Sequence, residues 1–284
     1  MTYLITGATG TVGSRIVELL LERGERPRVF VRNAERARER YGHSVDVAVG
    51  DLADAWSLSA SLNGVDALFL VNSGPEIAIR DRAAAVAAKS AGVKHLVKLS
   101  SMDAQQSVGT GAWHARGEAA ARATSSSIPF TFVQPTGFMS NALEWAHAIK
   151  AEGVVRAPTG DGKIPFIHPE DIAAVATQAL TTSQYVGASL PITGPQALSY
   201  AEMTALIADA IGKPLTFEPV DDDRERRQML EGGAPMEIVD AHISIYRAIR
   251  EGRLAAVTDN VERTLGRKPL TFAQWARDNA VAFR

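Results

Sequence analysis

Three glycines near the N-terminus have the spacing of a turn that binds a diphosphate. Gly7, Gly10 and Gly13 follow a short apolar run and open a stretch with apolar residues at helical spacing. Glycine permits a tight turn and the close approach of an anion, and the first turn of a helix offers free N–H groups and a partial positive charge. In this strand–turn–helix context the pattern predicts a dinucleotide site, although a merely tight turn is the alternative. We expect the diphosphate to contact Gly7, Thr9, Gly10, Thr11, Val12 and Gly13.

Residues after the next three apolar runs indicate which dinucleotide binds. Arg32 stands where proteins that bind NAD usually carry an acid, and a guanidinium there can pair with the 2′-phosphate of NADP. Asp51 can accept a hydrogen bond from the adenine amino group, Leu52 can pack on the ring, and Asn72 and Ser73 can line the ribose nearest the nicotinamide. The sequence therefore favours NADPH. The alternatives are a surface role for Arg32 at the start of a helix and a turn or cap role for Asp51.

Short apolar runs alternate with helical stretches over the first half of the chain. This rhythm predicts an α/β fold with a doubly wound parallel sheet, a Rossmann domain, over residues 1–155. The rhythm changes after residue 152, and we expect residues 156–284 to form a smaller α+β region that covers the substrate, with residues 190–193 as a candidate strand that returns to the sheet. The predicted strands are Tyr3–Thr6, Arg28–Val31, Val45–Val49, Ala67–Val71, His95–Leu99, Phe130–Val133 and Leu190–Thr193.

Helix boundaries are marked by capping residues. The expected helices of the first half span residues 11–23, 54–64 and 77–91, each with glycine near its end. In the second half, His168–Asp171 opens a helix, Ser199 with Glu202 and Thr271 with Gln274 match capping boxes, and the charged run 221–227 is interpreted as the start of a solvated helix.

Composition excludes several classes of function. The chain has 284 residues, a net charge of −2 and no cysteine, so disulfides, zinc–thiolate sites and a cysteine nucleophile are absent. The six histidines lack the spacing of metal ligands, so no metal is expected. There is no basic patch for nucleic acid and no apolar run long enough for a membrane. We expect a cytoplasmic monomer or homodimer whose partner is a small-molecule substrate.

Several segments together resemble one family. The chain is similar to the NmrA-like group of atypical short-chain dehydrogenase/reductases over nearly its whole length. That resemblance implies a Rossmann domain with a smaller C-terminal domain; members include NADPH-dependent quinone and enone reductases, and also redox sensors that bind the dinucleotide without turnover. The matching segments are residues 5–10, 49–52, 65–67, 99–101, 137–141, 166–173 and 193–195.

The Tyr-x-x-x-Lys pair that active short-chain reductases usually carry is missing from this sequence. His114 and Glu118 occupy the two places at i, i+4 spacing. His114 titrates near neutrality and is a candidate general acid that Glu118 orients, whereas a surface or structural pair is an equally weighted alternative. Ser100 and Ser101 end the fifth strand; we assign Ser101 to catalysis with His114 and Ser100 to the cofactor. The family alignment also permits Met102 at the place of the catalytic hydroxyl.

A pocket for a flat substrate is expected after the sixth strand. Thr136 and Phe138 follow that strand, and Met102, Trp113 and Trp145 are further candidates for its wall, with core packing the favoured interpretation for Trp145. Relatives often carry Arg where this chain has Gln134, and Asp171 is interpreted as a structural brace.

The leading hypothesis is an NADPH-dependent oxidoreductase that transfers hydride to a small quinone-like, enone or other electrophile. One alternative is a non-catalytic regulator that senses NAD(P). Another is a non-redox isomerase, cyclase or lyase on the same scaffold, with His114 as acid and base.

Overall fold

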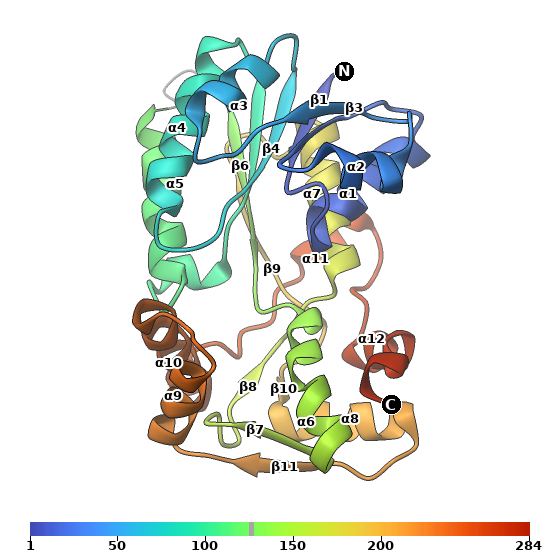
Figure 1. Ribbon diagram of the computed structural model, residues 1–284, viewed down its shortest axis with the longest axis vertical. Helices are drawn as coiled ribbons and strands as arrows, with labels where there is room; N and C mark the ends of the chain where they lie inside the picture. Colours follow the sequence, from blue (N-terminus) through green and yellow to red (C-terminus); the bar gives the residue numbers. More distant parts are fainter. Residues whose placement is uncertain (125–127) are drawn as a thin grey trace.

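Parallel strands form the central layer of the molecule. The computed structural model describes residues 1–124 and 128–284, and within them seven strands pair in the order β3-β2-β1-β4-β5-β6-β9 (Figure 1). Every pair is parallel, which confirms the predicted doubly wound sheet. The strands are β1 (Tyr3–Thr6), β2 (Arg28–Val31), β3 (Asp46–Val49), β4 (Ala67–Val71), β5 (His95–Leu99), β6 (Phe130–Pro135) and β9 (Ser189–Ile192).

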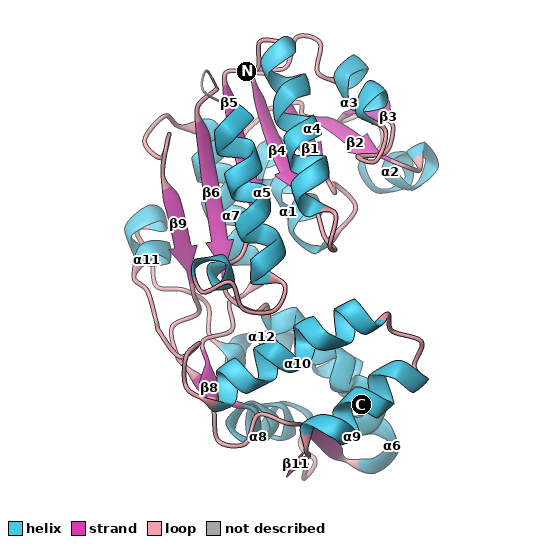
Figure 2. Cartoon of the chain, turned by 90° about the vertical axis from the view of Figure 1, so that its left-hand side faces the viewer, coloured by secondary structure: helices cyan, strands magenta, loops and turns pink. Residues whose placement is uncertain are grey.

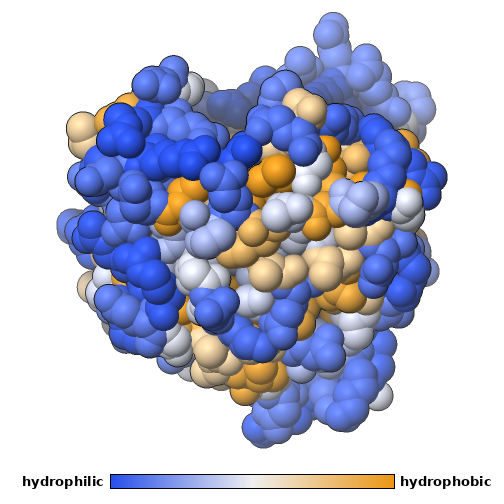
Figure 3. Space-filling model, turned by 90° about the horizontal axis from the view of Figure 1, so that it is seen from below, coloured by the Kyte–Doolittle hydropathy of each residue, from blue (hydrophilic) through white to orange (hydrophobic). Residues whose placement is uncertain are grey.

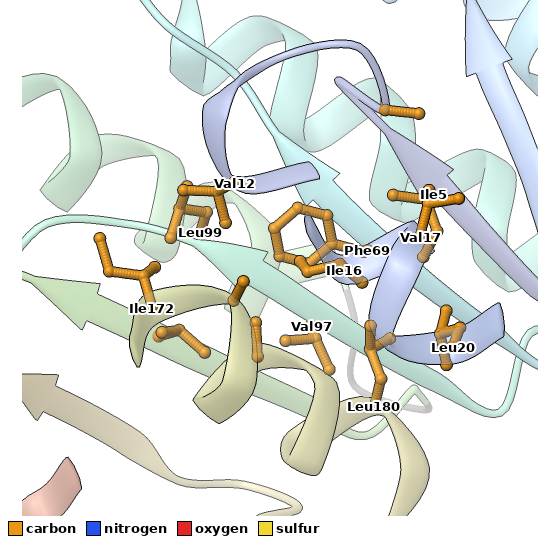
Figure 4. Close-up of a cluster of buried hydrophobic side chains, with 14 of the residues drawn as sticks. Ile5, Val12, Ile16, Val17, Leu20, Phe69, Val97, Leu99, Ile172 and Leu180 are labelled. Atoms are coloured by element: carbon orange, nitrogen blue, oxygen red, sulfur yellow. The ribbon is translucent and has the colours of Figure 1, made fainter. Parts of the chain in front are cut away.

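Helices cover both faces of this sheet because the strands carry apolar side chains on both. On one face α1 and α7 pack side by side, and Figure 4 shows Ile16 and Leu20 of α1 beside Phe69 of β4, Val97 of β5 and Leu180 of α7. Two more helices join this face, and three helices cover the opposite one. The first face holds α1 (Thr11–Glu22), α2 (Ala34–Tyr41), α7 (Pro169–Thr181) and α11 (Asn260–Leu265); the second holds α3 (Ala55–Ser61), α4 (Ile77–Ser90) and α5 (Gly111–Thr124).

The order of the strands places a crevice at the end of β1. From β1 the chain runs outward to β2 and β3, then crosses back to β4 on the other side of β1. The loops that follow β1 and β4 therefore diverge, which is where ligands bind in open α/β sheets.

A second lobe lies beyond the carboxyl ends of the strands (Figure 2). Strand β7 pairs with β11 in parallel and β8 pairs with β10 antiparallel, around an apolar core that includes Ile207 and Trp275. These strands are β7 (Val154–Ala157), β8 (Lys163–Ile164), β10 (Leu198–Ser199) and β11 (Thr216–Pro219). The remaining helices are α6 (Ala146–Glu152), α8 (Tyr200–Ile211), α9 (Asp222–Glu231), α10 (Met236–Arg250) and α12 (Phe272–Asp278), with 3-10 turns η1 (Met102–Gln105), η2 (Met139–Trp145) and η3 (Ala280–Phe283).

The two lobes share the second half of the chain. Although α7 and β9 follow residue 155, α7 packs against α1, and β9 pairs with β6. The division into residues 1–155 and 156–284 stays a prediction.

Capping interactions fix several helix ends. The capping boxes of Ser199 and Thr271 both form. Asp221 caps α9, a helix in which no residue is buried, as the charged run predicted. Buried Asp171 accepts a hydrogen bond from the Leu270 backbone at 2.7 Å, so it ties the start of α7 to the C-terminal segment.

The outer end of the second lobe is partly apolar. Viewed from that end, apolar residues gather near the centre of the surface and polar residues surround them (Figure 3). The alternation along β7, where Val155 and Ala157 are buried while Val154 and Arg156 are half-buried, shows that its small sheet is fully covered on one side only. No helix of the described residues is long and apolar enough to cross a membrane.

Candidate functional site

The glycine turn leaves the first turn of α1 open. Gly7 has a φ of +61°, a conformation that favours glycine, and a Cβ on Gly13 would lie 2.2 Å from the Gly7 carbonyl oxygen. Helix α1 starts after Gly10, and no side chain caps it. The first N–H groups of a helix have no carbonyl partner within the helix, so those of α1 are free to bind a ligand in the crevice. This arrangement fits a bound diphosphate, because the backbone dipoles attract the anion and no side chain stands in its way.

A cleft of about 470 Å³ extends from this turn across the ends of β2, β3 and β4. All the residues assigned to the cofactor from the sequence line it, except Ser100. Exposed Arg32 lies in the wall of the cleft at the end of β2, a place that fits a 2′-phosphate. Asp51 also lines the cleft, and its side chain accepts a hydrogen bond from the Ala53 backbone at 2.9 Å. Sequence reasoning missed Arg80 of α4, whose guanidinium is held by Glu76 at 2.5 Å.

A second cavity of about 450 Å³ adjoins this cleft, between the carboxyl ends of the strands and the second lobe. The two share wall residues, so a ligand that fills the cleft ends where the cavity begins. The shared residues are Val71, Asn72, Ser73, Leu99 and Phe138. A pocket of this size, with apolar walls and a few polar groups, suits a small organic substrate.

A buried ion pair positions Asn72 at this junction. The Asn72 amide donates to Asp81 at 2.7 Å, and the other Asp81 oxygen lies 2.7 Å from the Lys98 ammonium. Both charged side chains are fully buried, and a Cβ on Gly117 would lie 2.3 Å from the Asp81 carboxylate, so glycine in α5 makes room for it. Sequence reasoning missed this pair; the signals were a lysine inside an apolar strand and an aspartate inside an alanine-rich helix.

His114 lines the second cavity but does not titrate near neutrality. Burial, with a smaller contribution from the nearby Lys98 charge, lowers the pKa of His114 to about 3. Its Nδ1 atom is buried and has no hydrogen-bond partner among the described residues. A pKa this low favours the neutral imidazole at pH 7 and argues against the expected role of His114 as a charged general acid.

Glu118 binds other partners than His114. Its Oε1 atom accepts hydrogen bonds from Ser100 Oγ and Gln134 Nε2, each at 2.6 Å, and Gln134 in turn accepts one from Gln105. Glu118 thus braces β5, β6 and α5 against one another beneath the cavity. The prediction that it orients His114 is wrong, and Ser100 belongs to this network and to the cavity wall instead of the cofactor cleft.

The turn after β5 decides which of its side chains reach the cavity. Ser101 Oγ accepts a hydrogen bond from the Asp103 backbone at 3.2 Å, and both residues line the cavity. Met102 between them does not line it, so its assignment to the pocket is wrong. Trp113 does not line the cavity either: next to His114 on the helix, it points about 100° away and packs on Ile77 of α4 and Ala241 of α10.

Thr136, Phe138 and Trp145 do line the cavity, so Trp145 is more than a core residue. The opposite wall was missed from the sequence because it comes from the second lobe. It includes Ile164 and Phe166 after β7, Tyr200 of α8, and His242, Ile245, Tyr246 and Ile249 of α10.

The burial of Asp103 should make the free energy of unfolding depend on pH. Desolvation raises the pKa of Asp103 to about 6, above its usual 3.8. The folded protein therefore holds this proton more tightly than the unfolded chain, and the contribution to stability falls as pH rises from about 4 to 6. Asp103→Asn should raise the free energy of unfolding by about 2–3 kcal/mol at pH 7 and leave it unchanged at pH 4.

Urea unfolding at the two pH values measures this difference. The same replacement at exposed Asp161 is the control for losing a surface carboxylate. An equal effect of Asp103→Asn at both pH values would show that burial does not perturb this carboxyl.

Comparison with known proteins assigns the family. The model of the NmrA-like family matches residues 1–276. The chain belongs to the NmrA-like family. An NAD(P)H azoreductase of Xenophilus azovorans is 39% identical over 283 residues, which are 99% of this chain and 98% of the relative. A (4-alkanoyl-5-oxo-2,5-dihydrofuran-3-yl)methyl phosphate reductase of Streptomyces griseus is 38% identical over 283 residues, again 99% of this chain and 98% of the relative.

Solved structures of the same architecture confirm the fold of this NmrA-like protein. An NADPH-dependent quinone oxidoreductase of Escherichia coli, solved with NADPH, matches with a TM-score of 0.88 at 24% identity, over 98% of this chain and 99% of that one. The same overall fold is thus found in a solved structure over nearly the whole chain.

Proposed function

We propose that this protein is an NADPH-dependent reductase that transfers a hydride to a small quinone-like, enone or other electrophile. The observation that carries the proposal is the shared wall between the dinucleotide cleft and the apolar cavity, which includes Asn72 and Phe138. A donor that ends at this wall lies against an acceptor in the cavity. The names of the two relatives, an azoreductase and a reductase of a dihydrofuranylmethyl phosphate, support reduction as the reaction class.

Cofactor binding is assigned to the residues of the cleft. Gly7, Gly10 and Gly13 admit the diphosphate, Arg32 pairs with the 2′-phosphate, and Asn72 faces the ribose next to the nicotinamide. When bound, NADPH supplies the hydride. The ion pair of Asp81 and Lys98 fixes the Asn72 amide, so the orientation of that amide is set before any ligand arrives.

Substrate activation is assigned to neutral hydrogen-bond donors. Hydride addition to a quinone or enone leaves negative charge on an oxygen, which a donor can stabilise without giving up its proton. His114 carries one N–H in its neutral form, and Ser101 carries a hydroxyl; both line the cavity. Because the pKa of His114 is depressed to about 3, the proton that completes the reaction comes from solvent. The same pKa counts against a non-redox enzyme that uses His114 as acid and base.

Steady-state oxidation of NADPH in the presence of a quinone and an azo dye tests this proposal. We expect loss of NADPH absorbance with at least one acceptor, and His114→Ala to lower kcat while the Kd for NADPH stays the same. Tight binding of NADPH without turnover on any acceptor would replace the reductase with the sensor alternative. The cytoplasmic location and the monomeric or homodimeric state stay predictions.

A further inference from the structure

The substrate cavity is lined by carboxylic acids but by no lysine or arginine of the described residues. Among the described residues that line it, Asp103 and Glu144 are carboxylic acids, His114 and His242 are imidazoles, and none is lysine or arginine. Asp103 lies deep in the wall, whereas Glu144 is exposed at the end of η2. An anionic substituent that entered this space would meet carboxylates and no cation.

Most cations on the elements around the cavity are paired with carboxylates. Lys98, behind His114, is neutralised by Asp81 at 2.7 Å. On α10, which forms part of the far wall, Arg247 and Arg250 both bind Asp222. On the neighbouring helix α9, Arg224 binds Glu218 at 3.0 Å and Arg226 binds Asp240 at 2.5 Å, whereas exposed Arg227 has no carboxylate partner among the described residues. The paired cations therefore give little attraction to an anion inside the cavity.

Aromatic residues make up much of the far wall. Tyr200 is the centre of a cluster: its ring centroid lies 5.0 Å from that of Trp145, 6.1 Å from Phe166 and 6.3 Å from Tyr246. The planes of these three rings are inclined to that of Tyr200 by 47°, 67° and 80°, so the rings are tilted toward one another and not stacked. Such a wall packs on flat molecules, and the negative ring faces attract positive charge.

A further carboxylate stands behind this wall. Glu225 of α9 and Glu144 both lie close enough to Tyr246 to add to the effect of burial, which raises the pKa of that phenol. The negative field thus comes from η1, η2 and α9, three separate elements around one space.

We propose that this cavity selects flat aromatic electrophiles that are cationic or uncharged and discriminates against those that carry a sulfonate or carboxylate. The proposal rests on the reductase function above and specifies its substrate class. Two carboxylates in the wall of the same cavity weaken the binding of a partly desolvated anion by roughly ten- to a hundredfold relative to a neutral analogue. A cationic analogue gains from the same charges and from the ring faces.

Three naphthoquinones with one core test the proposal. Each carries a propyl side chain that ends in trimethylammonium, methyl or sulfonate, so that the charge changes while the quinone ring stays the same. We expect kcat/KM with NADPH to fall from trimethylammonium to methyl to sulfonate, with at least about tenfold between the last two. Equal values, or faster reduction of the sulfonate, would overturn the proposal.

Charge variants locate the source of the selectivity. Glu144→Gln should narrow the ratio between the cationic and the anionic quinone, and Glu144→Lys should narrow it further or invert it. Glu231→Lys makes the same change of charge at an exposed residue of α9 that does not line the cavity, and it should leave the ratio as in the wild type. A ratio that Glu231→Lys changes as much as Glu144→Lys would contradict a local origin.

Binding separates failure of this inference from failure of the reductase function. Trp145 lines the cavity, so quenching of tryptophan fluorescence gives a Kd for each quinone without any reaction. If no quinone oxidises NADPH but the Kd values keep the expected order, the reductase function fails and the charge selectivity stands. If NADPH is oxidised but neither Kd nor kcat/KM follows charge, the selectivity fails and the reductase stands.

Discussion

Replacing Lys98 with methionine should lower the free energy of unfolding by about 3–5 kcal/mol. The substitution keeps the length of the side chain but leaves the Asp81 carboxylate fully buried without its cation. The Asn72 amide alone cannot offset that charge. Urea unfolding at neutral pH, followed by circular dichroism, measures the loss.

An exposed ion pair of the same geometry provides the control. Lys94 and Asp66 are also 2.7 Å apart, but the Lys94 side chain is 72% exposed, so Lys94→Met should change the stability by less than about 1 kcal/mol. Similar losses for the two variants would contradict the importance of burial. In folded Lys98→Met we also expect weaker NADPH binding, because Asn72 loses its fixed orientation.

Arg32→Ala should weaken the binding of NADPH by about ten- to a hundredfold and leave the binding of NADH nearly unchanged. Arg32 is exposed and lines the cleft at the end of β2, where a guanidinium can pair with the phosphate that distinguishes the two cofactors. A charge-assisted hydrogen bond contributes about 1.5–3 kcal/mol, which corresponds to this range of affinity. Fluorescence titration with each cofactor measures both constants.

Arg36→Ala is the matched control for Arg32. Arg36 is an exposed arginine of the adjacent helix α2 and does not line the cleft, so its loss should affect neither cofactor. If Arg32→Ala weakens NADPH and NADH equally, Arg32 does not contact the 2′-phosphate and the preference for NADPH has another origin.

Local signals in the sequence predicted the Rossmann sheet well. The four runs Tyr3–Thr6, Arg28–Val31, Ala67–Val71 and His95–Leu99 are strands with the predicted bounds. Each is a mostly apolar stretch between turn residues, and such stretches are typical of strands that are buried on both faces. The dinucleotide cleft followed because its residues come from loops at strand ends, and the strand order brings these loops together.

The second cavity was only half predicted. In its inner wall, Ser101 and Phe138 come from loops that follow strands of the sheet, and His114 comes from the first turn of α5. Its outer wall comes from Tyr200 and Tyr246, whose approach depends on how α8 and α10 pack in the second lobe. No local pattern in the sequence encodes that packing.

The charge states of titratable side chains depend on their burial, which cannot be read from the sequence. His114 has the residue type of a neutral-pH acid, yet its surroundings remove the charge. Lys98 and Asp81 have the residue types of surface groups, yet they pair between the sheet and α4 with no exposure. In both cases the environment, not the residue type, determines the chemistry.

Titration of NADPH into the Gly10→Val variant tests most directly whether the glycine turn holds the cofactor. Gly10 has ordinary backbone angles, φ −92° and ψ 178°, and a Cβ there would lie 3.3 Å from the Gly7 carbonyl oxygen, a tight contact that a small shift of this turn relieves. Gly232→Val, at another glycine of ordinary φ outside the cleft, is the control.

We predict that Gly10→Val keeps the melting temperature of the wild type within a few degrees but binds NADPH at least about a hundredfold more weakly. Gly232→Val should bind it normally. A folded Gly10→Val protein with the wild-type Kd for NADPH would contradict the placement of the diphosphate at this turn.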